Sequence, residues 1–307
     1  DDQFDNQVMD WVKVIRNKVK MGAHPPGEFL VLDHLLHELR LFKSAGEIKL
    51  MEQAAKISAQ GHKRAMACCK PGIKEYEMEA ELLYAFTRNG SRAPAYNSIV
   101  AAGENSCILH YNANDAEVKE GDLVLIDAGC EYRYYASDIT RTFPATGKFS
   151  PEQKAIYEIV LAAQDAAIDA VAPGVSWDEP HKASVKVITQ GLVKLGLLKG
   201  KVSQLIKAEA YRDFYMHRVG HWIGMDVHDV GDYKIDDHWR LLEPGMVTTI
   251  EPGIYISPEN KKVDKRWRGI GVRIEDDVLV TKLGNKILSK GIPKTVEEIE
   301  SFMSSAV

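Results

Sequence analysis

Apolar residues recur every three or four positions over five stretches of the chain, which is the spacing of an amphipathic helix. The predicted helices cover residues 4–20, 44–69, 75–89, 150 to about 173, and 177–195. Two of these stretches begin with a capping box, Ser44 with Glu47 and Ser150 with Gln153. Pro and Gly pairs follow several of them, so the ends of the helices are also marked in the sequence.

Shorter runs rich in β-branched residues lie between the helices and predict strands. They read NSIVAAG, DLVLIDAG, DITRTF, MVTTIEPGIYI and GVRIEDDVLV. Because helices and strands come in blocks rather than in strict alternation, the pattern favours an α+β fold. Residues 1–43 are too few for a domain of their own. We interpret them as a terminal helix and linker left from a missing N-terminal domain, and residues 44–307 as the main domain.

Composition excludes several classes of protein. The 307 residues carry a net charge of -5 without a basic stripe, which argues against a nucleic-acid partner. No apolar run reaches the roughly 20 residues that a membrane helix needs. The four cysteines form no C-x-x-C pair, so we expect reduced thiols in a cytoplasmic protein.

Acidic residues stand at the ends of the predicted strands, where apolar residues would be expected. Asp127 ends one strand and Asp138 begins the next, a pair that by itself would be ordinary turn chemistry. Glu251 closes another strand before Pro-Gly. Within GVRIEDDVLV, alternation predicts Arg273 and Glu275 on one face of a strand. Buried carboxylates need a cationic partner, so four such acids predict a cation site.

Histidines add nitrogen donors to this set. HRVGHWIGMDVHD contains His217, His221 and His228, and ILHYN contains His110. Four carboxylates would be balanced by two divalent ions, and oxygen ligands with a single imidazole suit Mn²⁺ or a similar ion. A two-metal site of this kind implies hydrolysis. The spacing does not separate peptide substrates from phosphoesters.

The motifs DAG, SDITRTF, GHWIGMDVHD, EPGIYI and GVRIEDD, in this order, closely resemble those of the Xaa-Pro aminopeptidases of metallopeptidase family M24. The resemblance runs from about Glu38 to the C-terminus. It implies a pita-bread α+β domain with internal pseudo-twofold symmetry and a dinuclear, usually manganese, site. The substrates implied are peptides with proline in the second position. Homo-oligomers occur in the family and are an expectation here.

The resemblance also implies roles for individual residues. Asp138 and Glu275 would bridge the metals, Asp127 would chelate one, and His221 and Glu251 would complete the other. A metal-bridging hydroxide would attack the Xaa-Pro carbonyl carbon, and Glu251 would relay its proton to the prolyl nitrogen. His110 and His228 would donate hydrogen bonds to the substrate and to the developing oxyanion. Tyr96, His217 and Arg273 would line the proline pocket. Tyr255 and Arg273 would also support the acids.

Two departures from the family pattern and three alternative functions remain at this point. The family's large N-terminal domain is missing, and HRVGHW places Arg218 and Gly220 where relatives often have smaller or hydroxyl residues. Prolidase, which hydrolyses only Xaa-Pro dipeptides, is the nearest alternative, and methionine aminopeptidase lies further off. A peptide-binding module without turnover is the alternative from another class.

Overall fold

The computed structural model describes residues 2–305 and divides the chain into two units, one up to Leu36 and one from His37 onward. The α-helices are α1 (Asp2–Arg16), α2 (Leu32–Leu41), α3 (Ala45–Cys68), α4 (Glu75–Arg88), α5 (Pro151–Asp169), α6 (Glu179–Lys194), α7 (Val202–Lys207) and α8 (Val296–Ser305). Short 3₁₀ helices are η1 (Val19–Met21), η2 (Gly103–Cys107), η3 (Ala210–Asp213) and η4 (Lys265–Trp267). In this described range, no helix combines the length and apolarity needed to cross a bilayer.

Among the described residues of the second unit, thirteen strands form five small antiparallel groups. Two groups matter for the site. The first consists of β2 (Ile99–Ala102), β3 (Leu123–Asp127) and β6 (Thr140–Pro144). The second consists of β13 (Gly284–Ile287), β12 (Asp276–Thr281) and β9 (Val247–Ile250). A third group pairs β10 (Gly253–Ile256) with β11 (Ile270–Arg273). The others are β1 (Ala93–Pro94), β4 (Cys130–Tyr132) and β5 (Tyr135–Ala136), and β7 (Lys234–Ile235) with β8 (His238–Trp239).

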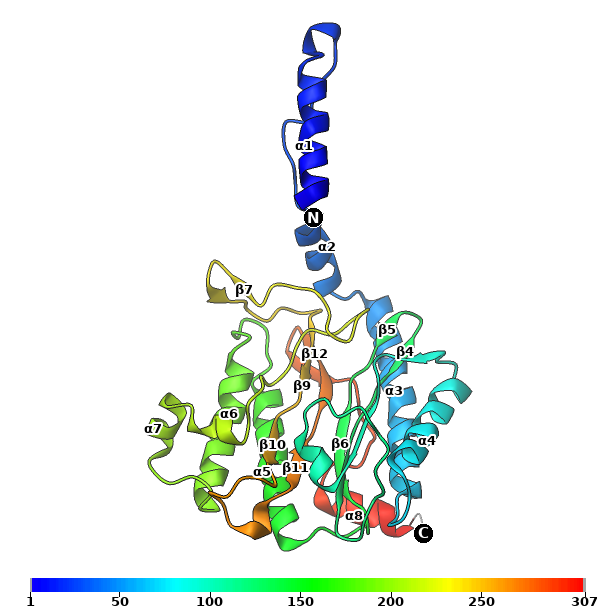
Figure 1. The fold of residues 1–307 in the computed structure, drawn as a ribbon, viewed down its shortest axis with the longest axis vertical. Coiled ribbons are helices and arrows are strands. Elements are labelled where there is room, and N and C mark those ends of the chain that lie inside the picture. Colours follow the sequence, from blue (N-terminus) through cyan, green and yellow to red (C-terminus); the bar gives the residue numbers. More distant parts are fainter. Residues whose placement is uncertain (1, 306–307) are drawn as a thin grey trace. The chain divides into compact units, whose positions relative to one another are not determined.

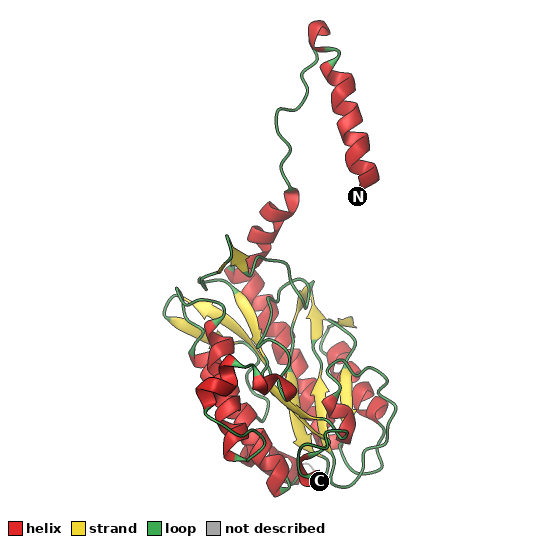
Figure 2. Cartoon of the chain, turned by 60° about the vertical axis from the view of Figure 1, so that its left-hand side comes forward, coloured by secondary structure: helices red, strands yellow, loops and turns green. Residues whose placement is uncertain are grey.

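Each half of the second unit combines a helix pair with strands. α3 packs on α4 beside β2 and β4, and α5 packs on α6 beside β9, β10 and β11. Figure 1 shows the strands between these two helix pairs, and Figure 2 shows the same arrangement turned by 60°. Apolar side chains from both helix pairs and the intervening strands form one continuous core. The α+β class expected from the sequence is therefore confirmed.

Local sequence signals explain where the long helices begin. Ser44 and Ser150 accept hydrogen bonds from the backbone of Glu47 and Gln153, and these two side chains accept from the capping residues in return. The helix expected over residues 4–20 is observed as α1, which ends at Arg16.

Two expectations need correction. Residues 32–41 are helical (α2) rather than part of a linker, because their apolar positions continue at helical spacing.

GVRIEDDVLV is not one strand: β11 ends at Arg273 and β12 starts at Asp276, so Glu275 lies in the break rather than inside a strand. The strand pairs differ on the two sides of this break, β10 with β11 and β9 with β12, and the chain changes partner there.

Candidate metal centre

The register of two strand groups brings the predicted acids to one region. Asp127 is the last residue of β3 and pairs with Thr140, and Asp138 lies two residues before Thr140. In the other half, Asp276 pairs with Ile250. The antiparallel register therefore sets Glu251 and Glu275, one position further on, across from each other. The Glu275 backbone N–H donates to the Thr140 carbonyl at 3.1 Å, which joins the two halves at the site.

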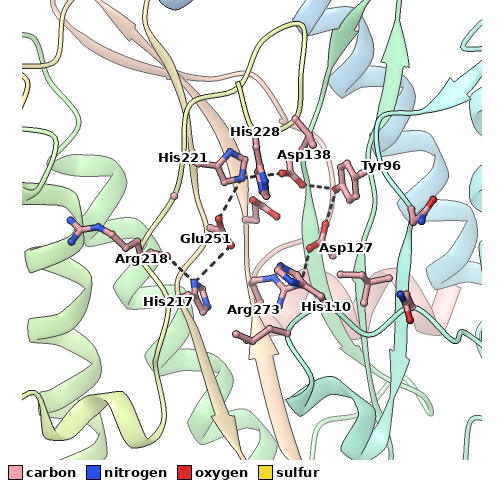
Figure 3. A pocket seen from close by; sticks show the side chains of 17 residues that line it. Tyr96, His110, Asp127, Asp138, His217, Arg218, His221, His228, Glu251 and Arg273 are labelled. Carbon is pink, nitrogen blue, oxygen red and sulfur yellow. Dashed lines mark hydrogen bonds and ion pairs between the residues drawn. The ribbon is translucent and has the colours of Figure 1, made fainter. Parts of the chain in front are cut away.

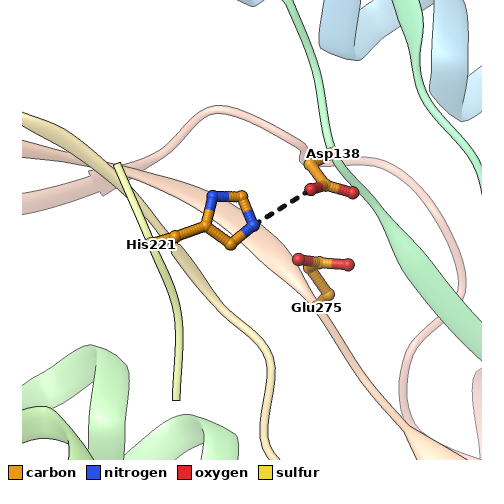
Figure 4. A group of neighbouring side chains, drawn as sticks. All are labelled: Asp138, His221 and Glu275. Atoms are coloured by element: carbon orange, nitrogen blue, oxygen red, sulfur yellow. Dashed lines mark ion pairs between the residues drawn. The ribbon is translucent and has the colours of Figure 1, made fainter. Parts of the chain in front are cut away.

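Three of the predicted ligands converge on one point. Asp138, His221 and Glu275 each offer an atom within 4.8 Å of the others (Figure 4). Asp138 and Glu275 are almost fully buried. His221 Nδ1 lies 3.0 Å from the Trp222 carbonyl oxygen, which can only accept, so this nitrogen carries the proton of the neutral ring. Nε2 lies 3.3 Å from Asp138 Oδ2: the protonated ring donates to this oxygen, and the neutral ring leaves the Nε2 lone pair free for a cation.

The other two predicted ligands line the same cavity, which measures ≈ 450 Å³ (Figure 3). Asp127 accepts from Arg273 Nη2 at 2.7 Å, and the Tyr96 hydroxyl lies 2.7 Å from Asp127 Oδ1. The same hydroxyl lies 2.5 Å from Asp138 Oδ1, and with one proton it donates to one aspartate at a time. Glu251 Oε1 lies 3.6 Å from His221 Nε2. Tyr96 therefore contacts the acids directly, in addition to lining the cavity.

Burial and mutual repulsion disfavour the ionised form of most carboxylates in this cluster. Burial raises the pKa of Asp127 and raises that of Glu251 to about 7. Burial also raises the pKa of Glu275 well above its usual range, and the Asp138 charge raises it further. Burial would also raise the pKa of Asp138, but the hydrogen bond and charge of His221 lower it overall. Burial opposes the His221 cation, yet Asp138 and Glu251 raise its pKa to about 9. Crowded carboxylates beside an imidazole lone pair thus fit divalent cations, which stabilise all the acids at once.

A hydrogen-bonded chain supports one side of the cluster. Arg273, which is 3% exposed, donates from Nη1 to the Tyr255 hydroxyl at 3.0 Å as well as to Asp127. The Tyr255 hydroxyl lies 2.9 Å from His217 Nε2. His217 Nδ1 lies 2.8 Å from the Arg218 carbonyl oxygen and so carries the proton, which leaves Nε2 to accept from Tyr255. Burial and the nearby Arg273 charge lower the His217 pKa to about 3, so this ring stays neutral.

His110 and His228 have exposed side chains and line the cavity from two different loops. The His228 ring lies 4.3 Å from the His221 ring in a T-shaped arrangement. His110 follows η2 on a loop between β2 and β3. Both imidazoles therefore line the same cavity as the buried acids (Figure 3).

The sequence reasoning missed two polar residues that contact the acids. The Thr140 hydroxyl donates to Glu275 Oε2 at 2.6 Å, and the Asp138 backbone N–H donates to Asp277 Oδ2 at 3.2 Å. Thr140 could have been found, because strand alternation after Asp138 puts it on the same face. Asp277 carried no such signal, since its contact depends on the break between β11 and β12.

Comparisons with known proteins agree with this geometry. The family model of metallopeptidase family M24 matches residues 49–282. The Xaa-Pro aminopeptidase of Haemophilus influenzae is 55% identical, over 88% of this chain and 62% of that protein. The human Xaa-Pro dipeptidase is 40% identical, over 90% of this chain and 64% of that protein. This chain thus spans less than two thirds of the length of either relative.

Among solved structures, Pseudomonas aeruginosa aminopeptidase PepP matches with a TM-score of 0.95 and 63% identity, covering 100% of this chain and 69% of that one. The match confirms the expected pita-bread fold. The family model covers most of the second unit and includes the five predicted ligands. The chain therefore belongs to metallopeptidase family M24.

Proposed function

We propose that this chain carries a metal-dependent Xaa-Pro aminopeptidase site, which releases the first residue from peptides with proline in second position. The observation that carries the proposal is the convergence of Asp138, His221 and Glu275 within 4.8 Å. The 55% identity to an Xaa-Pro aminopeptidase supports the choice of reaction.

The proposed centre holds two divalent ions, Mn²⁺ being the best match to a donor set of four carboxylates and one imidazole. Asp138 and Glu275 would bridge the two ions, Asp127 would chelate one, and His221 and Glu251 would complete the other. When bound, such ions supply an activated water for attack on the scissile carbonyl carbon and positive charge for its oxygen.

The chain's own residues would bind the peptide and move protons. His110 and His228 would donate hydrogen bonds to the substrate and to the developing oxyanion, because both side chains are exposed and line the cavity. Glu251 would hold the proton that passes to the leaving prolyl nitrogen.

Proline would lie against His217, Tyr96 and Arg273. The neutral His217 ring, held by Tyr255 and the Arg218 carbonyl oxygen, offers a fixed surface for an imino acid. We propose that Tyr255 and Arg273 also orient the acids, since Arg273 contacts Asp127 directly and Tyr255 contacts Arg273.

Residues 44–307 would form the peptidase domain. The four cysteines are free thiols. This state agrees with the cytoplasmic location that we propose. A homo-oligomer is part of the same proposal.

Prolidase is the second candidate, because the human Xaa-Pro dipeptidase is 40% identical to this chain. A peptide-binding module without turnover is disfavoured by the buried acids, which would be more stable as apolar residues if no cation bound them.

The test is to strip the protein of metal, add Mn²⁺, and follow release of the first residue from an Xaa-Pro-Yaa tripeptide and an Xaa-Pro dipeptide. Tripeptide cleavage that depends on Mn²⁺ is the expected result. Cleavage of the dipeptide alone would replace the proposal with prolidase, and metal binding without either reaction would favour the binding module.

A further inference from the structure

A second cavity adjoins the candidate metal centre and has a different character. It measures ≈ 500 Å³ and is lined by Trp177, Tyr233 and Trp239 together with Arg218, Gly220 and Lys234. We call it the aromatic pocket. The metal centre's cavity shares Arg218 and Gly220 with it, so these two residues lie between the cavities.

The aromatic rings come from two different segments and pack as one wall. Trp177 precedes α6 and is 5% exposed, whereas Tyr233 and Trp239 belong to the β7–β8 hairpin region and are half-buried. The Trp177 ring centroid lies 5.7 Å from that of Trp239 in a stacked arrangement and 4.6 Å from that of Tyr233. Trp177 thus anchors the wall in the core, and the two hairpin rings leave apolar surface open to a ligand.

Arg218 forms the boundary between the two cavities. Its guanidinium lies 4.6 Å from the Trp239 ring centroid and 5.2 Å from that of Trp177, and it is paired with the Asp178 carboxylate. The pairing and the stacking hold the guanidinium in place as a flat platform. Figure 3 shows Arg218 beyond His217, on the side of the cavity away from Tyr96.

Gly220 keeps this boundary thin. A Cβ there would lie 1.9 Å from the Thr249 carbonyl oxygen, so no side chain fits at this position. The backbone of residues 217–220 therefore runs from the metal centre to the aromatic pocket without a bulky side chain at Gly220.

We propose that the aromatic pocket binds the side chain of the first or second residue after proline in a peptide substrate, and that it selects uncharged aromatic or large apolar side chains. This inference rests on the proposed function. Arg218 and Gly220 line both cavities, so the space beside His217 leads past them to the aromatic pocket. A peptide with proline at His217 can thus bring its next residues to Arg218.

The charges around the pocket decide which side chains it accepts. Lys234 Nζ also lies 4.6 Å from the Trp239 ring centroid, so two cations already face this ring. A basic substrate side chain would meet repulsion from both. A neutral aromatic ring instead stacks on the guanidinium and the indoles and loses little hydration free energy on entry.

The test compares kcat/KM for Ala-Pro-Phe-Gly, Ala-Pro-Gly-Phe, Ala-Pro-Lys-Gly and Ala-Pro-Gly-Gly with the Mn²⁺-loaded full chain. We expect kcat/KM for one of the Phe peptides to exceed that for Ala-Pro-Gly-Gly by about tenfold, because the ring would be largely buried. The Lys peptide should have a kcat/KM no higher than that of Ala-Pro-Gly-Gly. The ratio of Phe to Gly peptide should fall below about threefold in Trp239→Ala and be kept in Trp239→Phe.

Tyr76→Ala serves as the matched control, because Tyr76 is a half-exposed aromatic on α4 outside both cavities. In this variant, the ratio of kcat/KM for the Phe peptide to that for the Gly peptide should equal that of the unmodified protein. Equal kcat/KM for all four peptides, or a Phe preference that Trp239→Ala leaves intact, would overturn the aromatic pocket while the proposed peptidase stands.

Absence of turnover with every peptide would count against the proposed function instead. In that case the same peptides are titrated against the fluorescence of the chain's five tryptophans, of which Trp177 and Trp239 line the pocket. Tighter binding of a Phe peptide, lost in Trp239→Ala, would still support the pocket, and equal affinities would refute it.

Discussion

Glu75→Gln should disturb the candidate site from a distance, because Glu75 holds the loop that carries His110. The Glu75 carboxylate is fully buried and accepts four hydrogen bonds: from Ala102 N at 2.7 Å, Asn105 Nδ2 at 3.1 Å, the Tyr111 hydroxyl at 2.7 Å and Ala116 N at 2.9 Å. These partners stand on both sides of His110 in the sequence. One side chain therefore ties both ends of the loop to the start of α4.

The expected magnitude follows from the donors that lose their acceptor. A glutamine side chain keeps one acceptor oxygen. Its NH₂ group has no acceptor atom and would face two of the four donors. Each buried donor left unsatisfied costs about 1–3 kcal/mol, so we expect unfolding to become easier by about 3 kcal/mol. Displacement of His110 should also lower kcat by tenfold or more, because a shift of about 1 Å at a catalytic group can cost about 100-fold.

The assay combines urea unfolding, steady-state kinetics with an Xaa-Pro-Yaa peptide, and bound Mn²⁺. Metal content should stay unchanged, since Glu75 contacts none of the five proposed ligands. Glu79→Gln is the matched control on the same helix: Glu79 accepts only from Asn114 Nδ2. It should cost about 1 kcal/mol or less. A Glu75→Gln protein that is destabilised but keeps full kcat would refute the role assigned to the His110 loop.

Four further substitutions test other parts of the structure. Thr140→Val removes the hydroxyl that contacts Glu275 and should weaken Mn²⁺ binding by about 10-fold or more, measured by titration; unchanged affinity would show that the contact is only structural. Asp138→Asn should lower metal occupancy and abolish turnover, whereas His228→Ala should lower the rate with metal retained, and metal analysis of both variants separates the roles. His62 is fully buried, and burial lowers its pKa from 6.5 to about 4, so the native ring stays neutral while the unfolded ring gains a proton below pH 6.5. Its contribution to stability is present above this pH and is lost as pH falls toward 4, by about 2 kcal/mol at pH 5. Urea unfolding at pH 7 and pH 5 should show a smaller loss in His62→Gln, and an equal loss in both proteins would contradict the assignment.

Sequence patterns predicted the framework of the site well, because capping boxes and strand ends are local signals. Ser44 and Ser150 mark the starts of α3 and α5 correctly. Asp127 and Asp138 were paired from their positions at neighbouring strand ends, and the register of β3 and β6 confirms that proximity. The convergence of Asp138, His221 and Glu275 is implied by the resemblance to the family and is observed.

The rest depended on contacts that no local pattern encodes. Glu275 seemed to continue a strand, but the change of partner between β11 and β12 could be seen only with both neighbouring strands present. The sequence marks Arg218 only as a departure from the family pattern. Its stacking on Trp239 and its pairing with Asp178 join segments about 20 to 40 residues apart.

The most direct test of the account is to add Mn²⁺ stepwise to the metal-free chain while measuring bound metal and Xaa-Pro-Yaa cleavage together, alongside Glu275→Gln. The account predicts that cleavage rises with bound Mn²⁺ and reaches its maximum near two ions per chain, and that Glu275→Gln neither retains this metal nor turns over. Full cleavage by the metal-free chain, or normal metal binding and turnover in Glu275→Gln, would contradict it.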